Sequence, residues 1–411
     1  MKAGWQTKTL GDVCEFQRGL TYAKGDEVDV SDNIVLRATN IDLATNLLDF
    51  SELKYIRDEI AVPENKKVKA GSLMICTASG SKSHLGKVAF IDDDYGYAFG
   101  GFMGMVTPKH ELYPKFLFHL MTSPAYKDFI AALSDGANIN NLKFDDLRQF
   151  AVPLPPLPEQ QRIVGILDDA FDGIATAKAN AEQNLQNARA LFESHLQTVF
   201  TQRGEGWVER SLSELCDIKH GFAFDGAEFS SEVPEGKPIV ITPGNFTEDG
   251  KLLFNEKNTK RFSGKPPAAF RFDIGDLVVV MTDLSSKMKI LGKPAFVETD
   301  DVLHNQRIGR VVFFDDSVEK RFVYYFMMSE GFLKNIKISA TGTMVKHTAP
   351  SRILSNVISF PVERKEQMQL VAKLDALREE TQRLESLYQR KLAALDELKK
   401  SLLHQAFSGA L

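Results

Sequence analysis

Two stretches of the chain carry apolar residues at alternating steps of three and four, with Lys, Arg and Glu filling the other faces. This spacing is typical of long helices that pack along one side. Because a single helix of this kind would expose its apolar stripe to water, we expect the two helices to pack on each other as a coiled coil. The predicted seam consists of Ile163, Leu167, Ile174, Leu185, Phe192, Leu370, Leu374, Leu377, Leu384, Leu395, Leu398 and Leu402.

The roughly 150 residues before each helix have a different pattern, with short β-rich runs between turn residues. Examples of these runs are 72–76 and 277–281. Longer stretches with the aliphatic and aromatic spacing of buried helices follow at 113–133 and 322–338. We therefore expect two mixed α/β domains, here called heads, in an α+β fold.

An internal repeat relates the two heads. Three apolar or small residues, Leu10, Cys14 and Gly19, recur at an unbroken shift of 202 positions as Leu212, Cys216 and Gly221. A repeat of this length indicates two complete copies of one structural unit. Further matched pairs are Gly86-Lys87 with Gly292-Lys293, Ser123 with Ser329, and Glu159-Gln160 with Glu366-Gln367.

The repeat and the helices together predict the domain organisation. We expect a first head at 1–155, a first long helix at 156–205, a second head at 206–362 and a second long helix at 363–411. Each helix has about 40 residues and is a rod of roughly 60 Å at about 1.5 Å per residue. Since the second head lies between the helices in the chain, the pair is predicted to be antiparallel, with a pseudo-twofold axis and a head at each end.

Composition narrows the class of protein. The chain has 411 residues, too many for one compact core, and its 43% hydrophobic and 26% charged residues are those of a globular protein. No apolar run is long enough to span a membrane, and the start lacks the features of a secretory signal, so we expect a cytoplasmic protein. The formal net charge of −5 means that any surface for nucleic acid must be a local cluster of cations.

Motifs for catalysis and for metal binding are absent from the sequence. There is no P-loop, no HExxH, no GxSxG elbow and no CxxC pair among the three cysteines. Gly100-Gly101 lacks the strand-to-helix setting of a dinucleotide site and is predicted to be a turn in a sheet. Leu154-Pro155-Pro156-Leu157 lacks the polar and aromatic residues of an amino-methyltransferase motif. We expect no catalytic residue, no metal and no cofactor in this chain.

Two basic loops rich in small residues occupy matching places in the heads, at 77–87 and 282–293. Their hydroxyls, backbone amides and cations suit contacts with phosphates and base edges, although a solvated hairpin is the alternative for any single lysine. The candidate DNA-binding residues in and around these loops are Arg37, Lys66, Lys67, Ser79, Ser81, Lys82, His84, Lys87, His220, Ser285, Ser286, Lys287, Lys289, Lys293, Arg307 and Arg310.

These features together resemble the specificity subunits of type I restriction and modification systems. The resemblance is carried by Trp-x4-Leu-x3-Cys at Trp5, by Gly-Lys-x-Ala-Phe at 86–90, and by Pro-Leu-Pro-Pro-Leu-Pro-Glu-Gln-Gln-Arg-Ile at 153–163. The second copy keeps one proline, Pro361, and the Glu-Gln pair of the last motif, which puts the geometry of that helix entry in doubt.

The resemblance implies a non-catalytic subunit whose heads each read one half of a bipartite, asymmetric target in double-stranded DNA. It also implies that the helices set the unread spacer between the halves. The expected partners are two methyltransferase subunits, which use S-adenosylmethionine to methylate adenine, and restriction subunits, which use ATP and Mg²⁺.

Exposed apolar residues on the helices are candidates for methyltransferase docking, with a wider seam as the alternative: Val164, Phe171, Val371 and Leu387. Two other functions remain open. A structural adaptor, in which the paired helices organise partner proteins and the heads bind peptides, predicts no salt-sensitive DNA affinity. An enzyme with an unrecognised site predicts turnover by the purified chain alone.

Overall fold

The computed structural model describes residues 4–79, 84–134, 141–202, 204–230 and 236–411. They form two compact units, Met1–Glu182 with Gln389–Leu411 and Gln183–Tyr388. The division between the units falls inside both long helices, so it follows neither set of head bounds expected from the sequence, and those bounds remain predictions. Each unit consists of one head and a segment of each helix, and is described by itself below.

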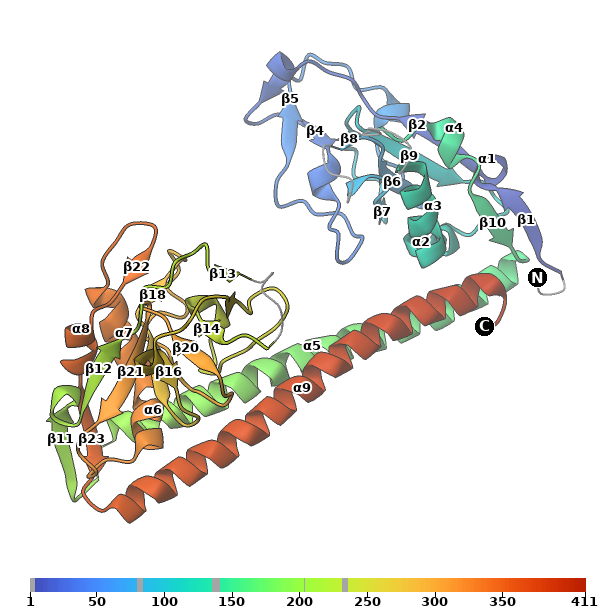
Figure 1. Cartoon of the computed structure of the whole chain (residues 1–411). Coiled ribbons are helices and arrows are strands. Elements are labelled where there is room, and N and C mark those ends of the chain that lie inside the picture. Colours follow the sequence, from blue (N-terminus) through green and yellow to red (C-terminus); the bar gives the residue numbers. More distant parts are fainter. Residues whose placement is uncertain (1–3, 80–83, 135–140, 203, 231–235) are drawn as a thin grey trace. The chain divides into compact units, whose positions relative to one another are not determined.

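The first head is built on an antiparallel four-stranded sheet, flanked by a smaller mixed sheet in which β4 and β8 are parallel (Figure 1). Its last strand, β10 (Ala151–Leu154), pairs with its first, β1 (Gln6–Thr9), and leads directly to the long helix. The main sheet has the order β2 (Cys14–Arg18), β9 (Met103–Pro108), β6 (Leu73–Cys76), β7 (Val88–Phe90). The smaller has the order β3 (Glu27–Val28), β5 (Lys54–Ile56), β4 (Asn33–Leu36), β8 (Ala98–Phe99), and the helices are α1 (Leu10–Val13), α2 (Pro114–Thr122), α3 (Pro124–Ser134) and α4 (Phe144–Leu147).

The second head repeats this plan, with β11 (Trp207–Ser211) paired to β23 (Val357–Pro361). A two-stranded ribbon joins β18 (Thr282–Asp283) to β22 (Lys346–His347). The main sheet has the order β12 (Cys216–His220), β21 (Ile308–Phe313), β17 (Leu277–Val280), β19 (Pro294–Phe296). The second sheet has the order β13 (Phe229–Ser230), β15 (Arg261–Phe262), β14 (Ile239–Ile241), β20 (Val302–His304), β16 (Arg271–Phe272), and the helices are α6 (Lys320–Met328), α7 (Glu330–Ser339) and α8 (Pro350–Leu354).

The residues that the repeat shares have the same structural tasks in both heads. Cys14 and Cys216 are buried, as expected, and burial raises the pKa of each thiol to about 12. A Cβ atom on Gly19 would lie 1.9 Å from the carbonyl oxygen of Gly100, and one on Gly221 would lie 2.3 Å from that of Asn305. Only glycine permits this close passage of two backbone segments, which explains why both halves have it.

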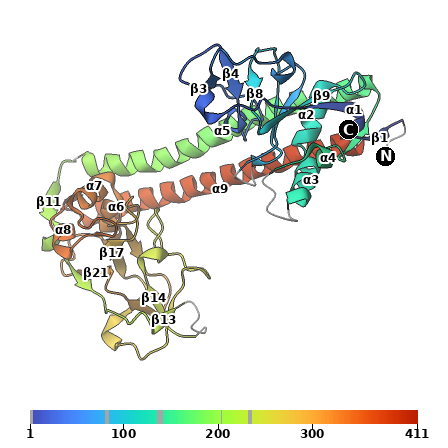
Figure 2. The same cartoon turned by 90° about the horizontal axis from the view of Figure 1, so that it is seen from above.

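The two stretches predicted to be helical, 113–133 and 322–338, each contain two helices separated by a serine. Ser123 separates α2 from α3, and Ser329 separates α6 from α7. The Ser329 hydroxyl accepts from the Phe332 backbone N–H, so it satisfies a donor at the start of the new helix. Figure 2 shows α6 and α7 on the side of the second head next to the long helices, with β13 and β14 on the far side.

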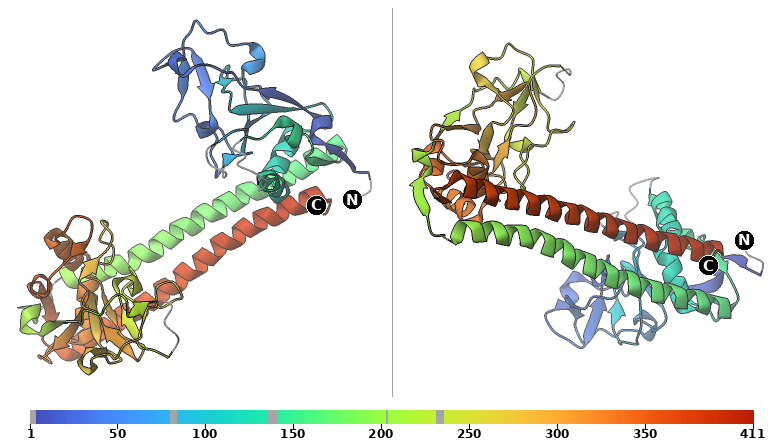
Figure 3. Two further views of the ribbon diagram at one scale, coloured as in Figure 1. Left: turned by 45° about the horizontal axis from the view of Figure 1, so that its top comes forward. Right: turned by 90° about the horizontal axis from the view of Figure 1, so that it is seen from below.

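The long helices, α5 (Leu157–Thr201) and α9 (Arg364–Ser408), have 45 residues each and pair antiparallel within each unit. In the first unit, Lys178 bonds Asp396 at 2.7 Å and Arg162 donates to the Leu411 carbonyl oxygen at 2.9 Å. In the second unit, Arg189 bonds Glu385 at 2.9 Å. The two helices lie side by side in both views of Figure 3. The predicted mixed α/β heads and antiparallel helix pair are therefore confirmed.

Most predicted seam residues are buried or half-buried, with Ile163, Leu167, Ile174 and Leu374 the most enclosed. Leu398 is an exception at 48% exposed, and its assignment to the seam was wrong. The heptad near the end of α9 shifts because the first head covers this segment, which buries Leu403 and Ala406 against Ile163. Among the residues that the structure describes, no helix is long and apolar enough to cross a membrane.

Candidate nucleic-acid interface

Antiparallel pairing brings the ends of four strands together at one end of the main sheet in the second head. We call this end of the sheet, where the strands enter their loops, the second edge. The end of β12, the start of β21, the end of β17 and the start of β19 all meet there. This second edge carries His220, Arg307 and the loop 281–293, and the first two are exposed. The Met281 backbone N–H donates to the Arg307 carbonyl oxygen at 3.0 Å, which joins the loop to the turn that holds the arginine.

The loop of the second edge presents most of its polar side chains to solvent. Ser285, Ser286 and Lys287 are exposed, and Lys289 is exposed but bonds Glu248 at 2.6 Å. Asp283, the one acidic residue in the loop, is 3% exposed and accepts from the backbone N–H groups of Ser285 and Ile290. The outward face of the loop is therefore cationic and rich in hydroxyls, as groove and phosphate contacts require.

The same edge of the first head carries different side chains. Arg18, at the end of β2, is exposed, and Phe102, before β9, is 74% exposed. Lys66 belongs to this edge, because its Nζ donates to the Arg18 carbonyl oxygen at 2.8 Å. Two of the predicted DNA contacts of this edge, Ser81 and Lys82, lie outside the described residues. Ser79 and His84 flank that gap and are half-buried.

Lys87 and Lys293, the two lysines of the Gly-Lys motifs, are partly buried inside their heads and do not lie at the tips of the loops. Lys87 Nζ donates to the Ile41 carbonyl oxygen at 3.1 Å, and burial lowers the pKa of Lys87. In the second head, burial lowers the pKa of Lys293 to about 8, and the nearby Lys337 acts in the same direction. Both side chains lie at the base of their loops, which the sequence pattern could not distinguish from the tip.

Replacement of Lys293 by Met should raise the thermal stability of the protein at neutral pH. The pKa of Lys293 is lower in the folded chain than the ordinary value of 10.5, so folding is disfavoured while the lysine is protonated in both states. Stability of the parent should rise between about pH 8 and pH 10.5, and the advantage of Lys293→Met should shrink over that interval. Melting temperatures measured from pH 7 to pH 10.5 test this, and an advantage that stays constant with pH would contradict it.

Other candidates from the sequence have partners within the heads. Arg310 Nη2 bonds the Asp276 carboxylate and donates to the Arg271 carbonyl oxygen at 2.7 Å, while its guanidinium lies 5.0 Å from the Phe272 ring centre. Lys67 pairs with Glu64 at 3.0 Å. Arg37 is half-buried. Arg310 and Lys67 stabilise the heads where they are and Arg37 is partly enclosed, so His220, Lys287 and Arg307 are the better candidates for DNA contact.

Sequence reasoning missed Arg18, although a signal for it was available. His220 was singled out, and Arg18 is the residue 202 positions before it, at the same end of the equivalent strand. A search of the repeat for charged residues opposite each candidate would have found it. The hairpin at 341–347 was also missed, because it reaches the second edge from a distant part of the sequence.

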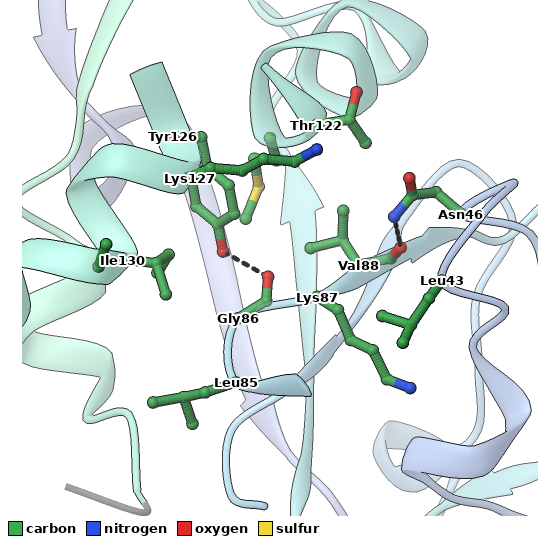
Figure 4. Close-up of a pocket in the computed structure, with 12 residues that line it drawn as sticks. Leu43, Asn46, Leu85, Gly86, Lys87, Val88, Thr122, Tyr126, Lys127 and Ile130 are labelled. Atoms are coloured by element: carbon green, nitrogen blue, oxygen red, sulfur yellow. Dashed lines mark hydrogen bonds between the residues drawn. The ribbon is translucent and has the colours of Figure 1, made fainter. Parts of the chain in front are cut away.

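A cavity of about 480 Å³ lies beside Lys87 in the first head, between the loop 43–46, α2 and α3 (Figure 4). Tyr126 donates to the Gly86 carbonyl oxygen at 2.9 Å and Asn46 donates to that of Val88 at 3.0 Å, which fixes two of its walls. In the second head, Gly250 takes the place of Asn46 in the matching turn. Its carbonyl oxygen accepts from the Tyr324 hydroxyl.

A buried glutamine ties each long helix to its head. Gln160 Oε1 accepts from the Tyr113 backbone N–H at 2.7 Å, and its Nε2 donates to the carbonyl oxygens of Glu111 and Pro155. Gln367 makes the same three bonds, accepting from Glu319 and donating to Ser317 and Pro361. Both side chains are 0% exposed. The second helix entry therefore has the geometry of the first, despite its missing prolines.

A carboxylate on each helix forms a second connection. In the first unit, Asp168 binds Lys115 at 2.7 Å and His119 at 2.8 Å. In the second unit, Asp375 binds Arg321 at 2.6 Å and the Tyr325 hydroxyl at 2.5 Å. Different side chains thus maintain the same joint between helix and head in the two units.

The candidate docking residues on the helices divide by burial. Val164 and Val371, expected to be exposed, are 3% and 6% exposed, and that expectation was wrong. Each packs in the core of its own head, because the helix begins against the head and is covered on a second face. Phe171 is half-buried beside His119 and Lys399. Leu387 is 43% exposed, so it is the accessible member of the set.

Comparison with known proteins adds independent findings. The family model described as the type I restriction modification DNA specificity domain matches the chain twice, at residues 2–187 and 204–391. The specificity subunits of the type I restriction enzymes StySPI, from Salmonella potsdam, and EcoKI, from Escherichia coli strain K12, are each 25% identical to this chain. Each match covers 99% of this chain and 89% of the relative.

Solved structures have the same fold. A chain from a study of complex assembly and conformational transition of the type I R-M system superposes with a TM-score of 0.79, at 18% identity, over 100% of this chain and 99% of its own length. The HsdS subunit from Thermoanaerobacter tengcongensis superposes with a TM-score of 0.63, at 18% identity, over 100% of this chain and 98% of its own.

Proposed function

Because the chain belongs to the type I restriction modification DNA specificity domain family, we propose that each of its heads reads one half of a bipartite, asymmetric DNA target. The observation that carries this proposal is the pair of equivalent sheet edges with unlike side chains. Arg18 and Phe102 occupy the places of His220 and Arg307. Related scaffolds with different contact groups select different bases, so the two halves of the target differ in sequence.

The long helices serve two purposes in this proposal. They set the unread spacer, since two heads on one duplex must meet grooves that recur every ~34 Å. They also provide equivalent platforms for two methyltransferase subunits, with Leu387 as the accessible candidate contact. The family assignment supports a non-catalytic role for the chain. Adenine methylation with S-adenosylmethionine, and restriction with ATP and Mg²⁺, then belong to partner subunits.

Methylation mapping tests the proposal directly. The chain is co-expressed with its methyltransferase subunits in a host without other adenine methylation, and the genome is sequenced for modified adenines. We expect one motif of two unlike half-sites separated by a fixed spacer. Purified complex should bind a duplex of that motif far more tightly than a scrambled one. Absence of a motif, together with DNA affinity insensitive to salt, favours the adaptor function instead.

Replacement of both Lys287 and Arg307 by Ala should weaken DNA binding and reduce its dependence on salt. Removal of one phosphate contact lowers the slope of log affinity against log salt concentration by about one, so a decrease of up to about two is expected. Fluorescence anisotropy at several salt concentrations measures the slope. Lys289→Ala is the matched control in the same loop, because Lys289 is paired with Glu248. An unchanged slope in the double variant would exclude these cations from the interface.

A further inference from the structure

A β-hairpin projects from the second edge, at residues 341–347. The Thr341 backbone N–H donates to the His347 carbonyl oxygen at 3.0 Å, and the His347 N–H donates to that of Thr341 at 2.9 Å. Gly342 allows the turn, since its φ is +95° and a Cβ atom there would lie 2.0 Å from the Val345 carbonyl oxygen. Lys346 Nζ donates to the Gly342 carbonyl oxygen at 2.7 Å and closes the hairpin further. The turn is thus held by its own bonds.

The hairpin is fixed to the basic loop of the second edge. Through β22 it pairs with β18, with Thr282 opposite His347 and Asp283 opposite Lys346. The His347 ring nitrogen and the Thr282 hydroxyl lie 3.1 Å apart, and the Thr348 backbone N–H donates to the Met281 carbonyl oxygen at 2.9 Å. Figure 1 shows β18 and β22 together in the second head. The hairpin and the loop therefore form one continuous surface.

Apolar side chains are exposed at the tip of this surface. Met344 is 80% exposed, Val345 is 37% exposed, and Leu284 in the adjoining loop is 62% exposed. Single exposed apolar residues are ordinary, but three on one hairpin and its supporting loop are a feature of binding surfaces. Thr341 and Thr343 are exposed beside them, so the tip offers hydroxyls and apolar groups together.

The charge of this surface identifies the kind of partner. Residues 284–289 and 341–347 include three lysines and a histidine but no Asp or Glu, in a chain whose formal net charge is −5. Asp283, at the base, is buried and satisfied by two backbone N–H groups. Glu248, an acidic neighbour of this surface, is bound to Lys289. Lys287, Lys346 and His347 remain beside it and are continuous with the cationic second edge, so the surface complements a polyanion rather than the mixed charges of a protein surface.

We propose that the hairpin 341–347 is a reading finger that enters a groove of the DNA target. The inference rests on the proposed function and adds the element that reads part of the second half-site. A two-stranded ribbon fits the major groove, which is ~12 Å wide, and an apolar side chain there meets the 5-methyl group of thymine. Met344 and Val345 contact base edges, while Lys287 lies where a phosphate contact positions the finger.

The finger is tested with Met344→Ala and Met344→Glu in the full-length chain, assembled with its methyltransferase subunits. The probes are a duplex of the mapped target and a scrambled duplex of equal length. We expect Met344→Ala to weaken target binding about tenfold, with little change for the scrambled duplex, because a base contact carries discrimination and not general affinity. Met344→Glu should weaken binding to both probes, since it places a carboxylate near phosphates.

The matched control is Ile274→Ala. Ile274 is 66% exposed in the same head but precedes β17, whereas the loop and finger follow the other end of that strand. It should leave both affinities unchanged. A methylation map of the Met344→Ala complex should show relaxed bases in one half-site only.

Two results would overturn the finger. One is that the Met344→Ala and Met344→Glu complexes bind both duplexes with the affinity of the parent complex. The other is normal DNA affinity with a loss of subunit assembly, which would make the hairpin a protein contact. Failure of the parent complex to distinguish the two duplexes is a different result, because it would count against the proposed function itself.

Discussion

Removal of one heptad from each long helix, 184–190 from α5 and 384–390 from α9, should shorten the spacer of the methylated motif and leave both half-site sequences unchanged. The two segments lie at the same level of the antiparallel pair, since Arg189 bonds Glu385 between them. Seven residues shorten a helix by about 10 Å and rotate its face by only ~20°. The remaining seam therefore stays in register.

The expected loss of affinity is large because both heads must bind one duplex at the correct distance and on the correct face. A change of about 10 Å corresponds to roughly three base pairs at ~3.4 Å each. Three base pairs also turn the duplex through about a third of a turn, so both heads cannot engage the original motif together. Affinity for that motif should fall at least ~100-fold, towards the value for unrelated DNA. Methylation mapping then reports the new spacer without any assumption about its length.

Deletion from α5 alone is the control for this experiment. It moves one helix past the other by a heptad, removes Arg189 and so leaves Glu385 without that partner, and separates Lys178 from Asp396. The single deletion should lose ordered structure and methylation of every motif. A well-folded double deletion that keeps the original spacer would show that helix length does not set the distance between the half-sites.

The periodic features of the fold were predictable from the sequence, because they depend on spacing alone. The repeat at 202 positions predicted two similar heads and the heptads predicted two paired helices. The place of the second head between the helices in the chain predicted that the pair is antiparallel. Contacts between heads and helices were not predictable in this way. Val164 and Val371 were predicted to be exposed, yet each is buried by its own head, since α5 and α9 begin against a domain surface.

The candidate interface was predictable only in part, for a related reason. Sequence places Lys87 and Lys293 in basic loops, but it does not give the direction of a side chain, and both turn towards the base of the loop. In the hairpin 341–347, His347 is separated by 65 positions from Thr282, the residue opposite it in the loop strand β18. Strand pairing between such distant segments depends on the folded sheet, and no local sequence pattern predicts it.

Replacement of Gln160 by Leu should destabilise the first unit by about 3–5 kcal/mol, a large part of the ~5–15 kcal/mol typical of a folded protein. The change preserves much of the side-chain volume but takes their partner from three backbone groups, the buried one of Pro155 and the partly buried ones of Tyr113 and Glu111. Gln367→Leu should have the same effect on the second unit. Hydrogen exchange measures each head separately, so each variant should lose protection mainly in its own head.

The neighbouring glutamines provide matched controls, because Gln161 and Gln369 are exposed on the same helices. Their replacement by Leu should change stability by less than about 0.5 kcal/mol. Gln160→Glu separates hydrogen bonding from packing. Its carboxylate still accepts from the Tyr113 N–H but faces two carbonyl oxygens that need a donor, so stability should recover as acid protonates it. Equal losses for Gln160→Leu and Gln161→Leu would mean that the bonds of this glutamine do not hold the helix to the head.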